Sequence, residues 1–510
     1  MLTEIPLGLE TGWSCEHRGG NSGFGCCLEI RRQRLYLYSQ SLDTQIAFTK
    51  NVVPSKDAGD LAELGHSQAL SRKFDTGSLL SLAFVVLGTW SVFAQSLASG
   101  LTNGGPITIL WGLCLVTFCN TCIGVSLGEM CSSMPTAMGQ TYWVSRLWPT
   151  PAGRFTSYLC AWINTFGWWH LLLTLLNVIS CRRDKILPVF NNFVGITFAG
   201  LFFVFGLALL ISVGTKDELR FQPPSFVFGA WINRTGWSDG IVWFMGLVQS
   251  AYGLTAFDAA IHLVEEIPAP RKNIPRVIWL SIICGAATGF LFMVVCLFCI
   301  QDLEQVLDPT TGLPFMDLVR STVGLQGAAV LIALFIITGL GQGVTVVTTA
   351  SRLTWGFARD GGIPWSSYFS HVDETWKAPV LLEAIVGVST IALTISYAIP
   401  ILTLLLVGRS KLPPAEFRLV RCGAAVNWVS IVYCLITTVF FFFPAEPNPA
   451  VPDMNYAIAV FGIILLFSIG FWFIKGRQTY LQVEDIAGRV IYGTAENHPQ
   501  GMAESDSKRD

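Results

Sequence analysis

Long apolar runs constrain the fold of this chain more than any other feature of its sequence. A helix that crosses a bilayer needs about 20 consecutive, mostly apolar residues. The 510-residue chain offers ten such windows, at 79–99, 107–130, 155–180, 193–214, 240–262, 276–300, 326–350, 383–407, 425–444 and 455–475. These runs are continuous and do not alternate over short segments, so we expect helices and not the strands of a barrel.

The composition agrees with a membrane protein and excludes other classes. Apolar residues make up 52% of the chain and charged residues 13%, against roughly 25% charged in soluble domains. The net charge of −2 leaves no basic surface for a nucleic acid. We therefore predict an all-α, polytopic membrane protein, surrounded by a lipid bilayer and without a nucleic-acid partner.

The polar ends of the chain set the expected domain boundaries. Residues 1–76 are polar and lack the apolar core of a signal peptide, so they are predicted to form a cytoplasmic N-terminal tail. The membrane domain is expected at 77–475 and a cytoplasmic C-terminal tail at 476–510. The pairs Cys119/Cys122 and Cys296/Cys299 lie in apolar runs without nearby His residues, so we expect no metal and no cofactor. No P-loop or nucleophile elbow is present, and an enzyme is not expected.

Positive charge orients membrane helices, because cytoplasmic loops are enriched in Lys and Arg. If the N-terminus is cytoplasmic and ten spans simply alternate, nine Lys and Arg fall outside, in the loops 181–192, 263–276 and 351–382. Only four fall inside, in the loops 215–238 and 301–325. If the spans in the middle of the chain run in the opposite direction, the basic loops lie inside, as the rule requires. This inversion of the middle block needs a change in the number of crossings, a parity change, near 155–180 and another near 383–407. The pattern indicates that one span is missing at each place.

Trp and Tyr residues gather where the runs end, as they do at membrane–water interfaces. They are Tyr142, Trp143, Trp148, Trp168, Trp169, Trp231, Trp237 and Trp472. The loop 215–238 also holds Asn233-Arg234-Thr235, which matches the N-glycosylation pattern. The match predicts a glycan on Asn233 outside the cytoplasm, and a chance match is the alternative.

Two apolar runs are interrupted by residues that let a helix unwind. The first run holds Gly88, followed by Thr89 and Trp90. The fifth holds small and polar side chains next to a carboxylate: Gln249, Ser250, Ala251, Tyr252, Gly253, Thr255, Phe257 and Asp258. Broken helices of this kind form the binding sites of many membrane transporters, because unwinding frees backbone groups for a ligand. For Gly88 alone, close packing of helices is the alternative.

Asp258 is a carboxylate at membrane depth, which makes it a candidate functional residue. His262 follows at i+4 and Glu265 at i+7, so the three share one helical face. Such a stripe of carboxylates and imidazole is suited to relaying protons. In the alternative, His262 lies at the cytoplasmic rim together with Glu265 and Glu266. There they cap a helix or pair with the basic residues that follow, Arg271 and Lys272.

The segment after Glu129 is the second candidate for a moving part. Glu129 ends the second run, and Pro135 and Gly139 break the helix soon after. The segment is either a mobile inner gate or a plain turn, and spacing alone does not separate the two. After the seventh run, Arg359 and Asp360 are expected to form surface ion pairs.

Several stretches together resemble the fungal amino acid/choline permeases of the amino acid–polyamine–organocation superfamily. They are LTNGGP at 101–106, GEM at 128–130, PTAMGQTYW at 135–143, GLTAFD at 253–258, EEIP at 265–268, ASR at 350–352, ARDGG at 358–362 and ISYAIP at 395–400. The resemblance covers most of residues 74–480. Each motif alone is weak evidence for this family, whereas the motifs together are specific to it.

The resemblance implies twelve helices built on two inverted repeats of five. It implies secondary transport of a small nitrogenous solute, such as an amino acid, 4-aminobutyrate, choline or a polyamine, with proton coupling. The solute would bind between the broken helices, among Gly88, Thr89, Trp90, Ser250, Ala251, Tyr252, Gly253, Thr255 and Phe257, with Tyr252 or Phe257 as an aromatic lid. Asp258, His262 and Glu265 would serve proton coupling, and Glu129 the gate.

The chain departs from the family pattern at two places. Residues 155–192 resemble the start of the family's third helix joined to the end of its fourth, and residues 379–407 keep its tenth helix without the ninth. Both places coincide with the parity changes, so about ten spans are visible where the family has twelve. Three explanations stay open: an exon-boundary error in the predicted gene, a degenerate product, and a true ten-span variant.

From the sequence we predict a multi-pass permease of the plasma membrane or an internal membrane, which moves an amino acid or related amine by alternating access. The alternatives are a membrane sensor that does not transport, an inactive truncated permease, and a permease that serves a metabolite pathway.

Overall fold

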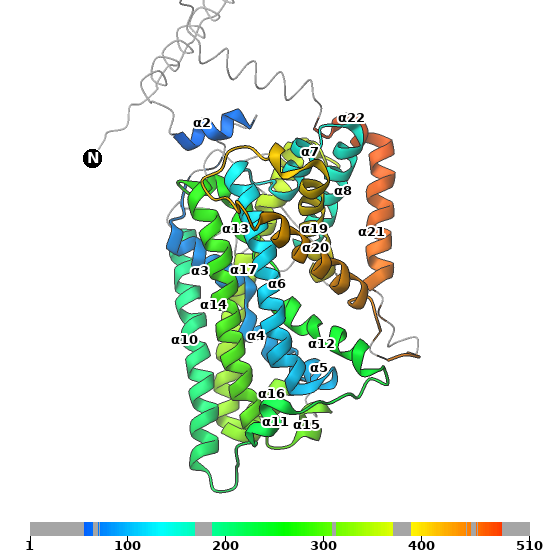
Figure 1. Cartoon of the computed structure of the whole chain (residues 1–510). Helices are drawn as coiled ribbons and strands as arrows, with labels where there is room; N and C mark the ends of the chain where they lie inside the picture. The colour runs from blue at the N-terminus through cyan, green and yellow to red at the C-terminus, as the bar shows by residue number, and fades with distance from the viewer. Residues whose placement is uncertain are drawn as a thin grey trace, which may run out of the picture. The chain divides into compact units, whose positions relative to one another are not determined.

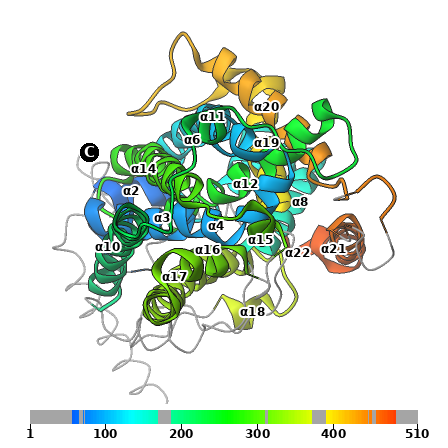
Figure 2. The ribbon, with the colours of Figure 1, turned by 90° about the horizontal axis from the view of Figure 1, so that it is seen from below.

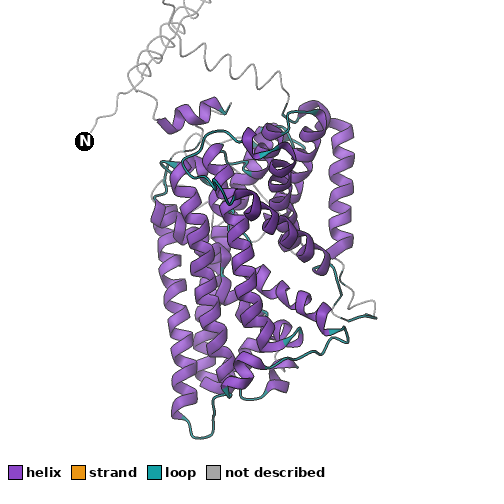
Figure 3. Ribbon diagram, viewed as in Figure 1, coloured by secondary structure: helices purple, strands orange, loops and turns teal. Residues whose placement is uncertain are grey.

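The computed structural model describes residues 56–64, 70, 72–168, 186–308, 313–370, 389–444, 446–449, 455 and 457–481. The chain divides after Lys56, and the unit from Asp57 onward is described here. Within the described residues all regular elements are helical, apart from one isolated bridge between Asn103 and Asn233 (Figure 3). The predicted all-α fold is confirmed.

Eight helical segments among the described residues are long and apolar enough to cross a membrane. They are α3 (Thr76–Leu87) with α4 (Thr89–Gln95), α6 (Gly105–Ser133), α10 (Ile186–Thr215), α14 (Pro270–Cys299), α17 (Leu325–Arg359), α19 (Ser389–Val407), α20 (Gly423–Phe440), and α21 (Ala457–Phe471) continued through η4 (Trp472–Gly476) and α22 (Arg477–Thr479). A multi-pass membrane protein is therefore confirmed.

The remaining elements are shorter. They are α2 (Lys56–Glu63), α5 (Leu97–Thr102), α7 (Gln140–Leu147), α8 (Pro151–Trp168), α11 (Pro224–Gly229), α12 (Asp239–Gly253), α13 (Ala259–His262), η1 (Val264–Glu266), α15 (Leu303–Leu307), α16 (Pro314–Val323), α18 (Ser366–Phe369) and η2 (Arg409–Lys411). The predicted span 240–262 is thus divided into α12 and α13. Part of the predicted span 155–180 lies outside the described residues, and α2 lies within the predicted N-terminal tail. The domain boundaries stay predictions.

The long helices pack in two groups. In the first, α14 packs along both α3 and α6, and α10 packs against α3 and α17 (Figure 1, Figure 2). The second group comprises α7, α8, α19 and α20, with α21 against α8, and it joins the first where α20 contacts α6. Glycines allow close approach: a Cβ on Gly124 of α6 would lie 2.7 Å from Ile282 on α14. This packing through small residues is typical of membrane helices.

The loops sort into two ends of the bundle. At one end, Arg234 forms an ion pair with Glu304, and Nζ of Lys216 donates to the carbonyl oxygen of Thr322 at 2.7 Å. These contacts join the loops 215–238 and 301–325. The described basic residues after α13 and at the end of α17 gather at the other end, where Arg352 pairs with Glu266 and Arg359 with Glu265. We call this basic end the inner end, because positive charge marks the cytoplasmic side.

Three backbone and side-chain contacts tie the inner end together. The amide of Lys73 donates to the carbonyl of Glu266 at 3.0 Å, and the amide of Leu481 donates to the carbonyl of Asp360 at 3.2 Å. Arg154, near the start of α8, donates to the carbonyl of Arg477 at 3.1 Å. Both described chain ends therefore lie on the side of the basic loops.

The helix directions reproduce both parity changes. The 30 residues of α10 span about 45 Å and end at the outer end, so α10 begins at the inner end, as α8 does. Likewise α17 ends at the inner end with Arg359, and α19 ends there too, because Arg409 just after it pairs with Glu129. Thus α8 and α10 both begin at the inner end, and α17 and α19 both end there. The two intervals, 169–185 and 371–388, lie outside the described residues.

Candidate functional site

The first break consists of one residue, Gly88, between α3 and α4. Its φ of +56° is left-handed, and a Cβ there would lie 2.0 Å from Nε2 of Gln342, so glycine is the residue that fits. Thr89, next in the chain, is buried against α14, where a Cβ on Gly285 would lie 2.6 Å from its hydroxyl. Trp90 is buried in an aromatic cluster with Phe198, Phe202, Phe205, Phe292 and Phe335.

The second break is longer, because α12 ends at Gly253 and α13 begins only at Ala259. Ala256 has a φ of +73°, which L-residues rarely adopt. The carbonyl of Leu254, freed by the break, accepts a hydrogen bond from Nδ2 of Asn120 on α6 at 3.1 Å. The hydroxyl of Thr255 donates back to the carbonyl of Ala251 at 2.5 Å. Neighbouring side chains thus satisfy the unwound backbone.

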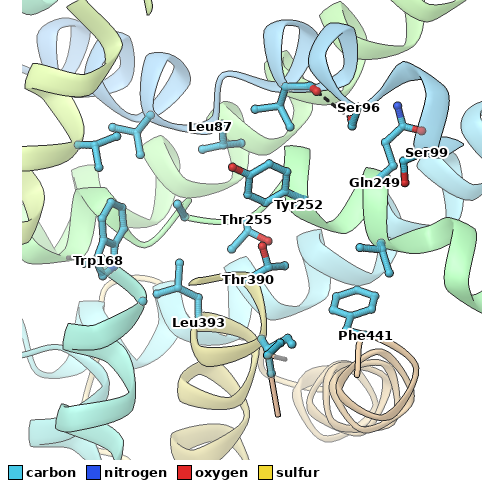
Figure 4. A pocket seen from close by; sticks show the side chains of 18 of the residues that line it. Leu87, Ser96, Ser99, Trp168, Gln249, Tyr252, Thr255, Thr390, Leu393 and Phe441 are labelled. Carbon is cyan, nitrogen blue, oxygen red and sulfur yellow. Dashed lines mark hydrogen bonds between the residues drawn. The ribbon is translucent and has the colours of Figure 1, made fainter. Parts of the chain in front are cut away.

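A cavity of about 450 Å³ lies beside the two breaks (Figure 4). The described residues that line it carry no charged side chain. Its polar and aromatic lining residues are Ser96, Ser99, Trp168, Gln249, Tyr252, Thr255, Gln342, Thr390, Phe441 and Asn455. Such a cavity offers hydrogen bonds and aromatic faces to a small solute.

Two of the nine predicted solute-binding residues, Tyr252 and Thr255, line this cavity. Tyr252 is 50% exposed and lies between Leu87 and Thr255 in Figure 4. The lining does not include Gly88, Thr89, Trp90, Ser250, Ala251, Gly253 or Phe257. Phe257 is buried against the ring of Tyr397, with ring centroids 5.0 Å apart, so it does not form a lid.

Behind the cavity wall, a cluster of side chains surrounds the buried Asp258. Its Oδ1 accepts a hydrogen bond from the hydroxyl of Tyr397 at 2.6 Å. Its Oδ2 accepts from Nε2 of Gln140 at 2.8 Å and from Nε1 of Trp168 at 3.5 Å, and Nε2 of His262 lies 3.1 Å away. These five residues are called the Asp258 cluster below. Four elements, α7, α8, α13 and α19, supply the partners, which satisfy a carboxylate buried away from water.

Trp168 belongs both to the Asp258 cluster and to the cavity lining. The sequence places it in an interfacial belt, and that interpretation is wrong: its side chain is buried and its Nε1 faces a carboxylate. It is therefore the side chain that joins the cavity to Asp258.

His262 bridges Asp258 and the turn between α6 and α7. Its Nδ1 lies 2.9 Å from the carbonyl oxygen of Ala137. A carbonyl oxygen only accepts, so Nδ1 must donate. A hydrogen bond between Nε2 and Oδ2 of Asp258 then needs one more proton, on the imidazole or on the carboxyl group.

Buried ion pairs occupy the inner end below this pair. Glu265 pairs with Arg359 at 3.2 Å, and Glu266 pairs with Arg352 at 2.7 Å with both side chains fully buried. These partners come from α17, whereas Arg271, expected to face the glutamates, pairs with Asp60 of α2 at 2.7 Å.

Two further expectations about the inner end can be compared with the structure. Asp360 lies 3.8 Å from Arg359, but it is buried and not at the surface as predicted. Glu129 contacts Arg409 at 2.6 Å and accepts the amide of Leu419 at 2.8 Å. It thereby fixes the loop between α19 and α20.

The side chain of Asn233 holds the outer loop together. Its Nδ2 donates to the carbonyl of Trp237 at 2.8 Å and to Oδ1 of Asp239 at 2.9 Å, and its Oδ1 accepts the amide of Thr235 at 3.1 Å. The nitrogen that would carry a glycan is thus engaged in this fold. Glycosylation stays a prediction.

The amino acid permease family matches residues 83–169 and, in a second match, residues 169–466. The chain belongs to the amino acid permease family. It is accordingly a membrane transport protein and not an enzyme. The two matches to this permease meet at Trp169, the residue that follows the end of α8.

Named relatives of the permease cover most of its length. It is 28% identical to a choline transporter of Saccharomyces cerevisiae, over 82% of this chain and 84% of that protein. It is 24% identical to a GABA-specific permease of the same yeast, over 82% of each. A putative amino acid/polyamine transporter of Macrophomina phaseolina is 27% identical over 75% of this chain and 97% of its own length.

Three partners of Asp258 in this permease were not predicted from the sequence: Gln140, Trp168 and Tyr397. Gln140 and Tyr397 stand within PTAMGQTYW and ISYAIP, so the motifs contained them without a role. Their contacts join residues 118 and 139 positions apart. Helical spacing detects only neighbours on one helix, such as Asp258 and His262.

Proposed function

We propose that this permease takes up a small nitrogenous solute, an amino acid or a related amine, together with a proton. The position of Asp258 carries the proposal. It is buried, its Oδ2 lies 3.1 Å from Nε2 of His262, and it accepts a hydrogen bond from Trp168, which lines the cavity. A carboxylate at membrane depth is costly and marks a functional site. One indole therefore connects a proton-binding group to a solute cavity.

The cavity lining favours a solute with a cationic nitrogen. Trp168, Tyr252 and Phe441 present aromatic side chains, and aromatic faces attract ammonium groups. Gln249 and Gln342 add hydrogen-bonding groups without fixed charge. Choline, 4-aminobutyrate and polyamines, named in the relatives, share a cationic nitrogen, which makes them the first solutes to test.

The test is solute accumulation by the purified full chain in proteoliposomes. Labelled choline, 4-aminobutyrate, a neutral amino acid and a polyamine are offered with and without an inward proton gradient. We expect at least one to accumulate above its equilibrium level and to leak out when a proton ionophore is added. A correctly inserted protein that accumulates none of them contradicts the proposal and favours a sensor or an inactive permease.

The role of Asp258 is tested with a matched pair of variants. Asp258→Asn should abolish pH-driven uptake while the protein still reaches the membrane. Asp217→Asn, in the exposed outer loop, makes the same chemical change and should leave uptake unaltered. Unchanged uptake by Asp258→Asn would remove Asp258 from proton coupling.

A further inference from the structure

We propose that the proton shared by Asp258 and His262 holds the inner end of the permease closed, and that its loss releases the turn at residues 134–139. The inference rests on the proposed function, because it gives the transported proton a mechanical task at the inner end. Within that turn, the backbone of Ala137 makes the direct contact with His262.

Three contacts fix the turn to the second break. The carbonyl of Ala137 accepts from His262 at 2.9 Å, and its amide donates to Oε1 of Glu265 at 3.3 Å. Gln140, at the start of α7, donates to Asp258 at 2.8 Å. The turn is fully buried at Thr136 and Ala137. Water and solute therefore cannot pass to the inner end at this point unless the turn moves.

The proton decides whether His262 can make both of its contacts. With the shared proton, Nδ1 donates to Ala137 and Nε2 bonds to Asp258. Without it, the neutral ring carries a single N–H. If that hydrogen is on Nδ1, the lone pair of Nε2 faces the carboxylate. If it is on Nε2, the lone pair of Nδ1 faces the carbonyl oxygen of Ala137. Either tautomer loses one contact, so deprotonation interrupts the chain of hydrogen bonds from Asp258 through His262 to Ala137.

Several charged groups on the surrounding elements pair with each other and not with Asp258 or His262. On α17, Arg352 and Arg359 pair with Glu266 and Glu265. The other titratable groups on these elements include Tyr397 on α19, which donates to Asp258, Tyr142 and Arg146 on α7, and Arg154, Tyr158 and Cys160 on α8. They also include Asp360 after α17 and Arg271, Lys272 and Arg276 on α14; α3 has none in its helix, and Asp75 caps its start. Among the described residues, the hydrogen-bond partners of Asp258 include no Lys or Arg. The shared proton is thus the positive charge that balances this carboxylate, and on release it passes to water entering from the inner end.

A cysteine in the turn measures this motion. Thr136→Cys introduces a thiol of similar size at a buried position, and its alkylation in the detergent-purified full chain is followed by mass spectrometry. The native Cys422, which is exposed, serves as internal reference, because thiolate formation raises all alkylation rates with pH. We expect the ratio of labelling at position 136 to labelling at Cys422 to rise about tenfold between pH 5.5 and pH 8, the effect of losing one hydrogen bond to a charged group.

Two further variants should shift this ratio in opposite directions. Asp258→Asn supplies an N–H to Nε2 of a neutral His262, so the bridge forms without the extra proton and labelling should stay slow at all pH values. His262→Leu removes the bridge, and labelling should be fast at all pH values. If Asp258 and His262 had a purely structural role, both variants would be labelled faster at position 136. That result would contradict the proposal.

The outcomes separate this inference from the proposed function. If labelling is independent of pH while uptake remains proton-driven, the bridge is wrong and coupled transport stands. If uptake does not depend on protons, the proposed function fails as well. Should His262→Leu not be recovered from the membrane, the pH dependence of the Thr136→Cys protein and the Asp258→Asn response decide the question.

Discussion

The two helix breaks of this permease were predicted by the same signal and differ in almost every other respect. At Gly88 the chain bends through one left-handed residue, and the next two side chains are buried away from the cavity. Between Gly253 and Ala259 the chain unwinds over several residues. Part of this stretch lines the cavity, and its last residue is Asp258, the centre of the Asp258 cluster. Unwinding alone therefore does not turn the side chains at a break toward the cavity.

The largest effect is expected where the second break continues into η1. Arg352→Met leaves Glu266 as an unpaired buried charge, which costs about 3–5 kcal/mol. We expect a large loss of folded protein in the membrane, measured by fluorescence-detected gel filtration. The control Arg234→Met breaks an exposed ion pair with Glu304 and should cost less than about 1 kcal/mol. Similar losses in both variants would show that the buried pair has no special weight.

Backbone substitutions compare the two breaks directly. Gly88→Ala puts a Cβ on a left-handed residue close to Gln342 and should destabilise the protein by about 1–3 kcal/mol. Ala256→Gly removes a Cβ from a left-handed residue and should stabilise by up to about 1 kcal/mol. Thermal unfolding in detergent measures both changes. A stabilising Gly88→Ala substitution would contradict the described geometry of the first break.

Substitutions of two tryptophans test which of them acts on uptake through its contact with Asp258. Trp168→Phe removes the Nε1 donor to a charged group, so the initial rate of pH-driven uptake should fall about tenfold. Trp90→Phe changes only the aromatic cluster, and uptake should stay within about twofold once expression is corrected for. Equal losses of uptake would mean that both tryptophans act through packing.

The smallest effect concerns the starts of the two broken helices. Asp75 caps α3, and the hydrogen bond from the amide of Ser78 lowers the pKa of Asp75 below its ordinary value of 3.8. Its stabilisation is therefore present above that pKa and is lost as the pH falls through the lowered value. Asp75→Ala should cost about 1 kcal/mol at pH 7 and less at pH 3.

Ser238 provides the matched control at the start of α12, because its side chain makes no capping hydrogen bond. Ser238→Ala should change the unfolding midpoint by much less than Asp75→Ala does, with no dependence on pH. If the two substitutions have equal effects at pH 7, the cap of α3 contributes nothing specific.

Much of the fold could be predicted because spanning a bilayer imposes long apolar runs, and because Lys and Arg mark the cytoplasmic side. The contact between Asp258 and His262 was also predictable, since residues at i and i+4 meet on one helix. Gly88 and the stretch before Asp258 marked the breaks for the same local reason. Each of these features depends on near neighbours in the chain.

The orientation of side chains beyond a break could not be predicted. The left-handed turn at Gly88 sets the rotation of α4, and it directs Trp90 into the aromatic cluster and not into the cavity. The partners of Glu265 and Glu266 come from α17, more than 80 residues away, although Arg271 is much closer in sequence. Tertiary packing chooses among oppositely charged residues, and their spacing along the chain does not report that choice.

The uncharged lining of the cavity has an electrical consequence. In the proposed coupling, a zwitterionic solute and the bound proton would give the loaded site no net charge, and after release the Asp258–His262 pair would return with a charge of −1. A membrane potential is worth about 2.3 kcal/mol per elementary charge for each 100 mV. A cell interior that is negative would therefore accelerate the empty return step and leave the loaded step almost indifferent to voltage, whereas a cationic solute would make both steps sensitive to it.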